Sequence, residues 1–259
     1  MRCDDIPCGP RVTVTTATER KPIPSDVAAF VDRLARACDH DLGSRLAGVF
    51  LIGSLAHGGY SERYSDIDIA VVLDSLSAAR ALAVVKERSM RASAALAPRL
   101  SLFWTDEAFA GGRFPLLDRV DYLDHGVALL QRRPAAPERP ALQAIRAHLR
   151  GAPLRKWVTA AARFRALRTL AAEDHKAYLR VLLYPARFIC TWETGRVVSN
   201  DDAVAYVRQR ERIGIDVDLI ERALSCRTRG ADLSELFPER HKLDRLVRTC
   251  VRVADEAGC

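Results

Sequence analysis

The sequence of 259 residues has no long apolar run: no stretch approaches the roughly 18 residues that a membrane-spanning helix needs. Cysteine patterns are missing as well. The seven cysteines contain no C-x-x-C pair and show no zinc-like spacing with histidine. An odd number of unpatterned cysteines indicates reduced thiols, so we predict a cytoplasmic protein with no membrane partner.

Residues 1–24 lack the apolar segment of a secretory signal and are polar and rich in proline and threonine. We expect a flexible N-terminal tail over this range. The formal net charge is +7, but the basic residues are mostly scattered arginines without interleaved aromatics. A nucleic-acid partner is therefore not favoured, although the charge alone leaves it open.

Apolar periodicity after the tail predicts a small mixed sheet covered by helices. We expect Ser25 to cap the first helix. The expected helices are 25–41, 76–96 and 114–125, and the expected strands are 45–52, 66–73, 99–105 and 127–130.

Three prolines between residues 134 and 140 indicate a domain boundary, because proline is excluded from helix interiors. Beyond it the pattern is helical throughout, with Gly195 placed to end a helix. The expected helices are 141–149, 154–172, 175–194, 199–209, 217–227 and 238–257. We therefore predict an α+β chain, with a small mixed-sheet domain at 25–133 followed by an all-α helical bundle at 141–259.

One segment of the sheet domain carries candidate chemistry. Gly53 and Ser54 directly follow the apolar run 49–52, and eleven residues separate Ser54 from Asp66. Asp66 and Asp68 open the next predicted strand, where alternate side chains point to one face. Paired carboxylates of this kind bind Mg²⁺ together with substrate phosphates. A Gly-Ser turn offers backbone N–H groups and a hydroxyl to phosphate oxygens. The sequence therefore predicts a nucleotide site.

This pattern resembles the G-S … D-x-D signature of the nucleotidyltransferase superfamily, which contains DNA polymerase beta and the antibiotic nucleotidyltransferases. The resemblance implies that Asp66 and Asp68 are catalytic and hold Mg²⁺, and that Gly53, Ser54 and Ser65 bind the nucleotide. A second, looser stretch, 183–206, resembles the C-terminal bundle of aminoglycoside adenylyltransferases. The resemblance implies transfer of a nucleoside monophosphate, AMP for preference, from ATP to a hydroxyl of an aminoglycoside-like antibiotic or small metabolite.

Two positions depart from that family pattern. Ser101 stands where the family has a third carboxylate on the third strand, and Asn200 stands where some relatives have lysine. A serine hydroxyl is a poor general base near neutral pH. The base could come from elsewhere; the acidic candidates are Asp106, Asp118, Asp121, Asp124, Glu173 and Asp174.

Three alternatives to that reading stay open. Transfer could proceed without a dedicated base. Catalysis could be lost, leaving a nucleotide-binding or partner-binding protein of the same fold. The acceptor could also be a tRNA or a protein.

Overall fold

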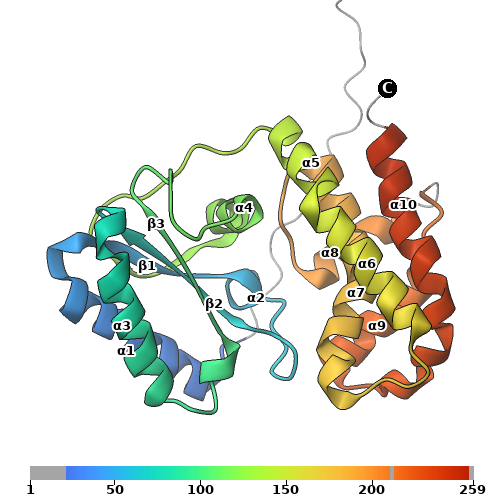
Figure 1. Cartoon of the computed structure of the whole chain (residues 1–259), viewed down its shortest axis with the longest axis horizontal. Helices are drawn as coiled ribbons and strands as arrows, with labels where there is room; N and C mark the ends of the chain where they lie inside the picture. The colour runs from blue at the N-terminus through green and yellow to red at the C-terminus, as the bar shows by residue number, and fades with distance from the viewer. Residues whose placement is uncertain (1–21, 211–212, 257–259) are drawn as a thin grey trace, which may run out of the picture.

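A computed structural model describes residues 22–210 and 213–256. The expected tail lies almost wholly outside these residues. The molecule has a sheet-containing part and a helical part that lie side by side (Figure 1). This arrangement confirms the predicted α+β fold, with a small mixed sheet followed by helices.

Four strands form the sheet in the order β3-β2-β1-β4. Strand β1 pairs antiparallel with β2 and β4, whereas β2 pairs parallel with β3. Opposite Asp68 lie Ile52 of β1 on one side and Ser101 of β3 on the other. The strands are β1 (Leu46–Ile52), β2 (Ile67–Leu73), β3 (Leu100–Asp106) and β4 (Val127–Gln131), each within one residue of its prediction at either end.

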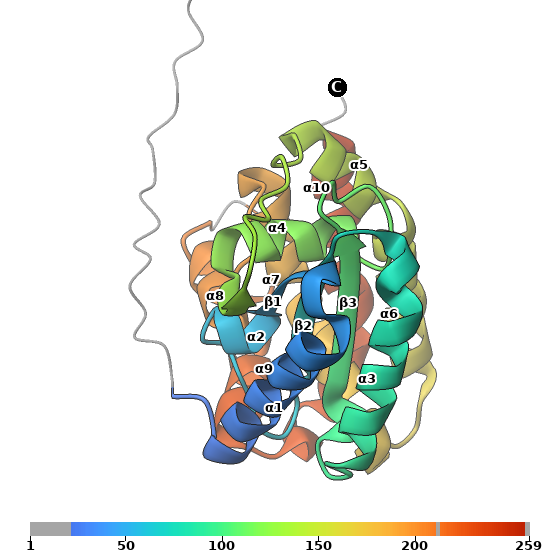
Figure 2. The same ribbon diagram turned by 90° about the vertical axis from the view of Figure 1, so that its left-hand side faces the viewer.

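The two faces of β2 have different neighbours because its side chains alternate. Ile67, Ile69 and Val71 pack in one core with helices α1 (Ser25–Leu42) and α3 (Ala79–Arg91), which lie across that face of the sheet (Figure 2). Ala70 belongs to a second core on the other face, which includes residues of helix α4 (Leu116–His125). The alternation therefore places Asp66 and Asp68 on the α4 face.

Two local predictions in this part are wrong. Ser25 does not cap α1: it is the first helical residue, Pro24 precedes it, and no side chain caps the helix. The helix expected at 76–96 is shorter. A 3-10 turn occupies Leu76–Ala78, and α3 ends at Arg91. Alanine-rich composition extended the predicted helix, whereas the chain forms turns before Pro98 and the start of β3.

Helix α7 (His175–Thr194) is the centre of the helical part, and Tyr178, Leu182 and Phe188 are among its many buried residues. It ends at Gly195, whose φ of 67° is left-handed, as predicted. The neighbouring helices are α5 (Leu142–Arg150), α6 (Ala152–Ala166), α8 (Asn200–Arg208), α9 (Val217–Arg229) and α10 (Leu243–Glu256). The predictions for α6 and α10 were too long: α6 ends at Ala166, and a 3-10 helix (Phe237–Lys242) precedes α10.

None of the described helices combines the length and apolar character needed to cross a lipid bilayer. The four described cysteines, Cys38, Cys190, Cys226 and Cys250, are all buried and free.

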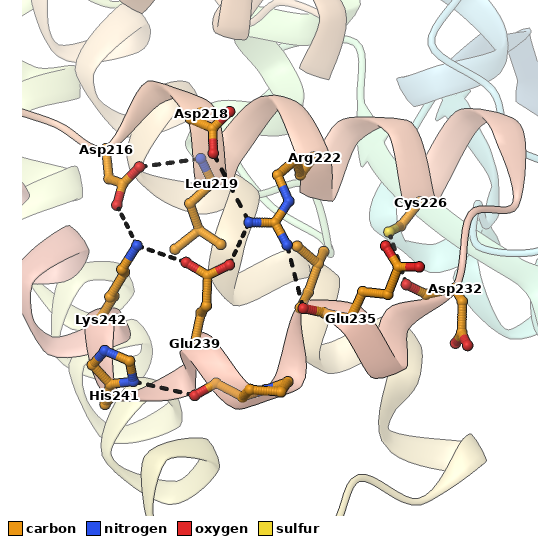
Figure 3. A network of polar contacts seen from close by, with 12 residues as sticks. Asp216, Asp218, Leu219, Arg222, Cys226, Asp232, Glu235, Glu239, His241 and Lys242 are labelled. Atoms are coloured by element: carbon orange, nitrogen blue, oxygen red, sulfur yellow. Dashed lines mark hydrogen bonds and ion pairs between the residues drawn. The ribbon is translucent and has the colours of Figure 1, made fainter.

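A network of charged side chains fixes α9 against the segment before α10 (Figure 3). Glu239 pairs with both Arg222 of α9 and Lys242, and Lys242 also lies 3.3 Å from Asp216 at the start of α9. Asp216 accepts a hydrogen bond from the backbone N–H of Leu219, which caps the helix. These contacts hold α9, the helix that carries Arg227 toward the sheet.

Candidate functional site

A cavity of about 540 Å³ lies where the sheet and helical parts meet, and residues of both line it. The sheet part contributes all five residues predicted for the nucleotide site: Gly53, Ser54, Ser65, Asp66 and Asp68. These residues come from three successive pieces of chain, namely α2 (Gly53–Ala56) directly after β1, the loop that follows α2, and the start of β2. The structure thus brings the predicted site residues together in one place; their chemical roles remain a proposal.

Gly53 has no room for a side chain. Its φ of 68° is left-handed, and a Cβ at this position would collide with the carboxylate of Asp68. Its backbone N–H donates to Oδ2 of Asp121 at 2.5 Å. A residue with a side chain is therefore excluded on two grounds, backbone conformation and space.

Asp66 bonds to cations of the helical part. Its Oδ1 lies 2.5 Å from Nζ of Lys176, and its Oδ2 lies 2.7 Å from the guanidinium of Arg180. Partial burial by itself raises the pKa of Asp66, but the hydrogen bonds and charges of these two residues outweigh it, so the net pKa is lowered. Asp66 is therefore ionised, and two charge-assisted bonds connect the two sides of the cavity.

Three other carboxyl groups face one another without such partners. Burial, together with the charges of Asp66, Asp118 and Asp121, raises the pKa of Asp68 to about 7. Burial and the charge of Asp121 raise the pKa of Asp118 to about 6. Burial also raises the pKa of Asp121, whose Oδ1 is buried with no hydrogen-bond partner among the described residues. These three carboxyl groups therefore disfavour one another's ionisation, whereas the positive charge of Arg187 favours their charged forms.

Ser101 occupies the position expected for the third carboxylate, because it pairs in register with Asp68 across β2 and β3 and lines the cavity. Of the six acidic residues considered as a replacement, Asp118 and Asp121 line the cavity. Asp121 is engaged by Gly53 N–H, which leaves Asp118 as the more available of the two.

The other four acidic candidates do not line the cavity. Asp106 lies at the far end of β3, opposite Leu73. Asp124 pairs with Arg139, Asp174 pairs with Arg163, and Glu173 is exposed.

Cations line the opposite, helical wall, and sequence reasoning did not select them. Arg180 and Arg187 of α7 and Arg227 of α9 all line the cavity. Arg227 is buried and donates to Oγ of Ser65 at 2.9 Å. Ser65 thus lines the cavity, as the predicted nucleotide site requires, and its hydroxyl also accepts a hydrogen bond from Arg227.

A signal for two of these cations, Arg180 and Arg187, is present in the sequence. Lys176, Arg180 and Arg187 are spaced by four and seven residues, which puts them on one face of α7. Charged residues repeated at helical spacing within a largely buried helix mark a face turned toward a polar cavity.

His57, directly after α2, also lines the cavity. Burial and the positive charge of Arg187 lower the pKa of His57 to about 3, so the imidazole is neutral at physiological pH. Its ring packs edge-on against His125, with ring centroids 5.6 Å apart. Asn200, which replaces the lysine of some relatives, lines the same cavity.

The donor atoms fit a magnesium ion held jointly with a substrate. Asp66 and Asp68 offer hard carboxylate oxygens from one face of a strand, and the Oδ1 of Asp121, which has no hydrogen-bond partner among the described residues, is a further carboxylate oxygen at this cavity. Within residues 22–210 and 213–256, no group of three or more His, Cys, Asp or Glu side chains is arranged to hold a metal ion. A cation here would therefore need further ligands, and phosphate oxygens of a nucleotide are suitable ones.

The crowding of carboxylates gives a prediction about stability. Below about pH 4, Asp68 is protonated in both the folded and the unfolded chain, so its burial does not lower the free energy of unfolding. Since its folded pKa is near 7, the folded state loses stability as pH rises from about 4 to 7. We expect Asp68→Asn to raise the free energy of unfolding by about 1–3 kcal/mol at pH 8 without Mg²⁺.

Chemical denaturation at pH 8 and pH 4 measures this difference. Asp74→Asn, which changes an exposed carboxylate just after β2, serves as the control and should shift stability equally at both pH values. An Asp68→Asn variant no more stable than the parent at pH 8 would contradict the prediction.

Comparison with known proteins agrees with this geometry. Residues 31–95 match the nucleotidyltransferase domain family, a range that includes Gly53, Ser54, Ser65, Asp66 and Asp68. The resemblance found in the sequence is thereby confirmed for this part of the chain, which carries a nucleotidyltransferase domain.

The whole fold is similar to a crystal structure of spectinomycin adenyltransferase AAD(9) from Enterococcus faecialis with ATP and spectinomycin. The TM-score is 0.55 and the sequence identity 14%, over 85% of this chain and 99% of that chain. The likeness extends to the helical part and shows a common fold. No curated protein matches the sequence.

Proposed function

We propose that this protein is a Mg²⁺-dependent nucleotidyltransferase. It transfers a nucleoside monophosphate, preferentially AMP, from a nucleoside triphosphate to a hydroxyl of a small acceptor. The observation that carries the proposal is the two-sided cavity. Asp66 and Asp68 line one wall, and Arg180, Arg187 and Arg227 line the other. A triphosphate needs both walls: cations for its oxygens and carboxylates for its metal.

Asp66 and Asp68 are proposed to hold Mg²⁺, which when bound neutralises charge on the phosphates. Gly53 and Ser54 bind the β- and γ-phosphates through backbone N–H groups and a hydroxyl. Ser65 orients Arg227 toward the same phosphates. In the comparison structure the nucleotide is ATP, which supports adenylyl transfer here.

Asp118 is proposed as the general base in place of the third-strand carboxylate. The acceptor oxygen forms a bond to the α-phosphorus and passes its proton to Asp118. The bond between the α-phosphorus and the bridging oxygen breaks, and pyrophosphate leaves with the electron pair. Positioning and charge neutralisation account for most of the catalysis.

The acceptor is proposed to be an aminoglycoside-like antibiotic or another small hydroxylated metabolite.

We further propose that residues 25–133 and 141–259 are separate domains, which the largely separate cores on the two sides of the cavity support. The four buried, free cysteines agree with the proposed cytoplasmic location.

Product formation tests the proposal. The protein would be incubated with Mg²⁺, the four nucleoside triphosphates, and pooled aminoglycosides and hydroxylated metabolites, with pyrophosphate release and products followed by mass spectrometry. We expect an adenylylated product that the Asp66→Asn/Asp68→Asn variant does not form. No product, together with no MgATP binding by calorimetry, would contradict the proposal.

A further inference from the structure

The sheet order separates the cavity into two ends. Ile52, directly before the Gly53 turn, and Ser101 lie on opposite sides of Asp68 in one register row. Phosphates bound at Gly53 and Ser54 therefore lie on the β1 side, with the metal carboxylates in the middle. An acceptor that approaches from the side away from the leaving pyrophosphate would lie over β3.

Besides the carboxylates and arginines, the cavity is lined by Ser101 and Phe103 of β3 and by Lys156, Trp157 and Tyr184 of helices α6 and α7. We call these five residues the acceptor subsite. Trp157 and Tyr184 are stacked, with ring centroids 4.8 Å apart and planes 24° apart. Nζ of Lys156 lies 5.5 Å from the centroid of the Trp157 ring. The subsite is thus aromatic, with one cation at its edge.

An unused polar group points to a ligand here. Tyr184 is only 9% exposed and lines the cavity, yet its hydroxyl has no hydrogen-bond partner among the described residues. A buried hydroxyl without a partner is costly, and a ligand that hydrogen-bonds to it removes that cost.

Carboxylates that could recognise ammonium groups are scarce at this end. Among the described residues, no Asp or Glu of the helical part lines the cavity. On the sheet side, Asp66 and Asp68 are assigned to the metal, and Asp121 accepts from Gly53 N–H. Asp118 and the Oδ1 of Asp121 then remain, both on α4 of the sheet part, and Lys156 opposes any further positive charge on the acceptor.

We propose that the acceptor subsite takes a neutral or anionic ring compound that bears a hydroxyl, and that it discriminates against polycationic acceptors such as aminoglycosides. This inference rests on the proposed transfer reaction and selects among its possible acceptors. Aromatic side chains hold the ring, the Tyr184 hydroxyl bonds to a polar substituent, and Lys156 attracts negative charge.

Binding of three matched phenols tests the proposal without requiring transfer. Tyramine, tyrosol and 4-hydroxyphenylacetate share a phenol ring and differ in charge at the end of the side chain. Each would be titrated, with Mg²⁺ and a non-hydrolysable ATP analogue, against fluorescence of the protein, and Trp157→Phe would assign the signal. We expect 4-hydroxyphenylacetate and tyrosol to bind at least about threefold more tightly than tyramine.

Two variants make the test specific. Lys156→Glu should reverse the preference between 4-hydroxyphenylacetate and tyramine, whereas Lys86→Glu, on α3 behind the sheet, should leave it unchanged. Tyr184→Phe should weaken tyrosol without altering the order of the three. Binding of tyramine as tight as or tighter than that of 4-hydroxyphenylacetate, no saturable binding of any phenol at millimolar concentrations, or an unchanged preference in Lys156→Glu would each overturn the proposal. Failure of the transfer reaction would instead appear as absent product with these binding results intact.

Discussion

Replacing Asp118 with asparagine is expected to lower kcat by about 100- to 1000-fold while leaving the affinity for MgATP within a few-fold of the parent. Asp118 is on α4 and lines the cavity. We propose that it replaces the third-strand carboxylate, because Ser101 occupies that position on β3. Asparagine keeps the shape of the side chain but cannot accept the proton of the acceptor hydroxyl. The loss should therefore fall on the chemical step.

Steady-state kinetics with the acceptor that the product screen identifies would give kcat, and calorimetry would give MgATP affinity. Asp106→Asn is the matched control, because Asp106 was an equal candidate in the sequence but lies at the far end of β3. If Asp118→Asn retained full kcat, the base would have to be sought elsewhere or dispensed with. If it lost MgATP binding to the same extent, Asp118 would be part of the nucleotide site instead.

Gly53→Ala is expected to destabilise the protein by about 1–3 kcal/mol and to lower transfer at least 100-fold. The new methyl group would meet the Asp68 carboxylate, so either the turn or the proposed metal ligand must move. Misplacement of a reacting group by even about 1 Å costs on the order of 100-fold in rate.

A control variant at a second glycine separates the effect of backbone strain from the effect of the steric clash with Asp68. Gly230 has a φ of 73°, close to that of Gly53, but a Cβ there would meet no atom within 4 Å. Gly230→Ala should therefore show the backbone penalty of about 1 kcal/mol with normal activity. Thermal unfolding and transfer rates of both variants measure the two effects. If Gly53→Ala and Gly230→Ala were equally destabilised and both kept full activity, the predicted clash between the residue 53 side chain and Asp68 would be contradicted.

The sequence predicted the sheet side of the site well because its residues are close in the chain. Gly53, Ser54, Asp66 and Asp68 lie within sixteen residues, and strand alternation fixes which face the two aspartates share. Apolar periodicity also located α7 without error. Local sequence patterns were thus sufficient to place a residue wherever its position depends only on its own strand, helix or turn.

The helical wall could be predicted only in part, because spacing marks a charged face of α7 but does not tell what that face meets. Whether Arg187 or Arg227 reaches the cavity depends on how α7 and α9 pack against the sheet, and that packing comes from contacts distant in sequence. The same limit applied to the missing base: Asp118 and Asp124 lie on one short helix, yet one lines the cavity and the other pairs with Arg139. Only the orientation of α4 distinguishes them.

The bonds from Asp66 to Lys176 and Arg180 have a thermodynamic consequence. A metal ion arriving alone must compete with two cations already held by that carboxylate. A triphosphate arriving alone finds the same cations occupied. When both arrive together, the partners can exchange: the carboxylate turns to the metal, and the lysine and arginine turn to the phosphates. Metal and nucleotide should therefore bind with positive cooperativity, each raising the affinity for the other by the same factor.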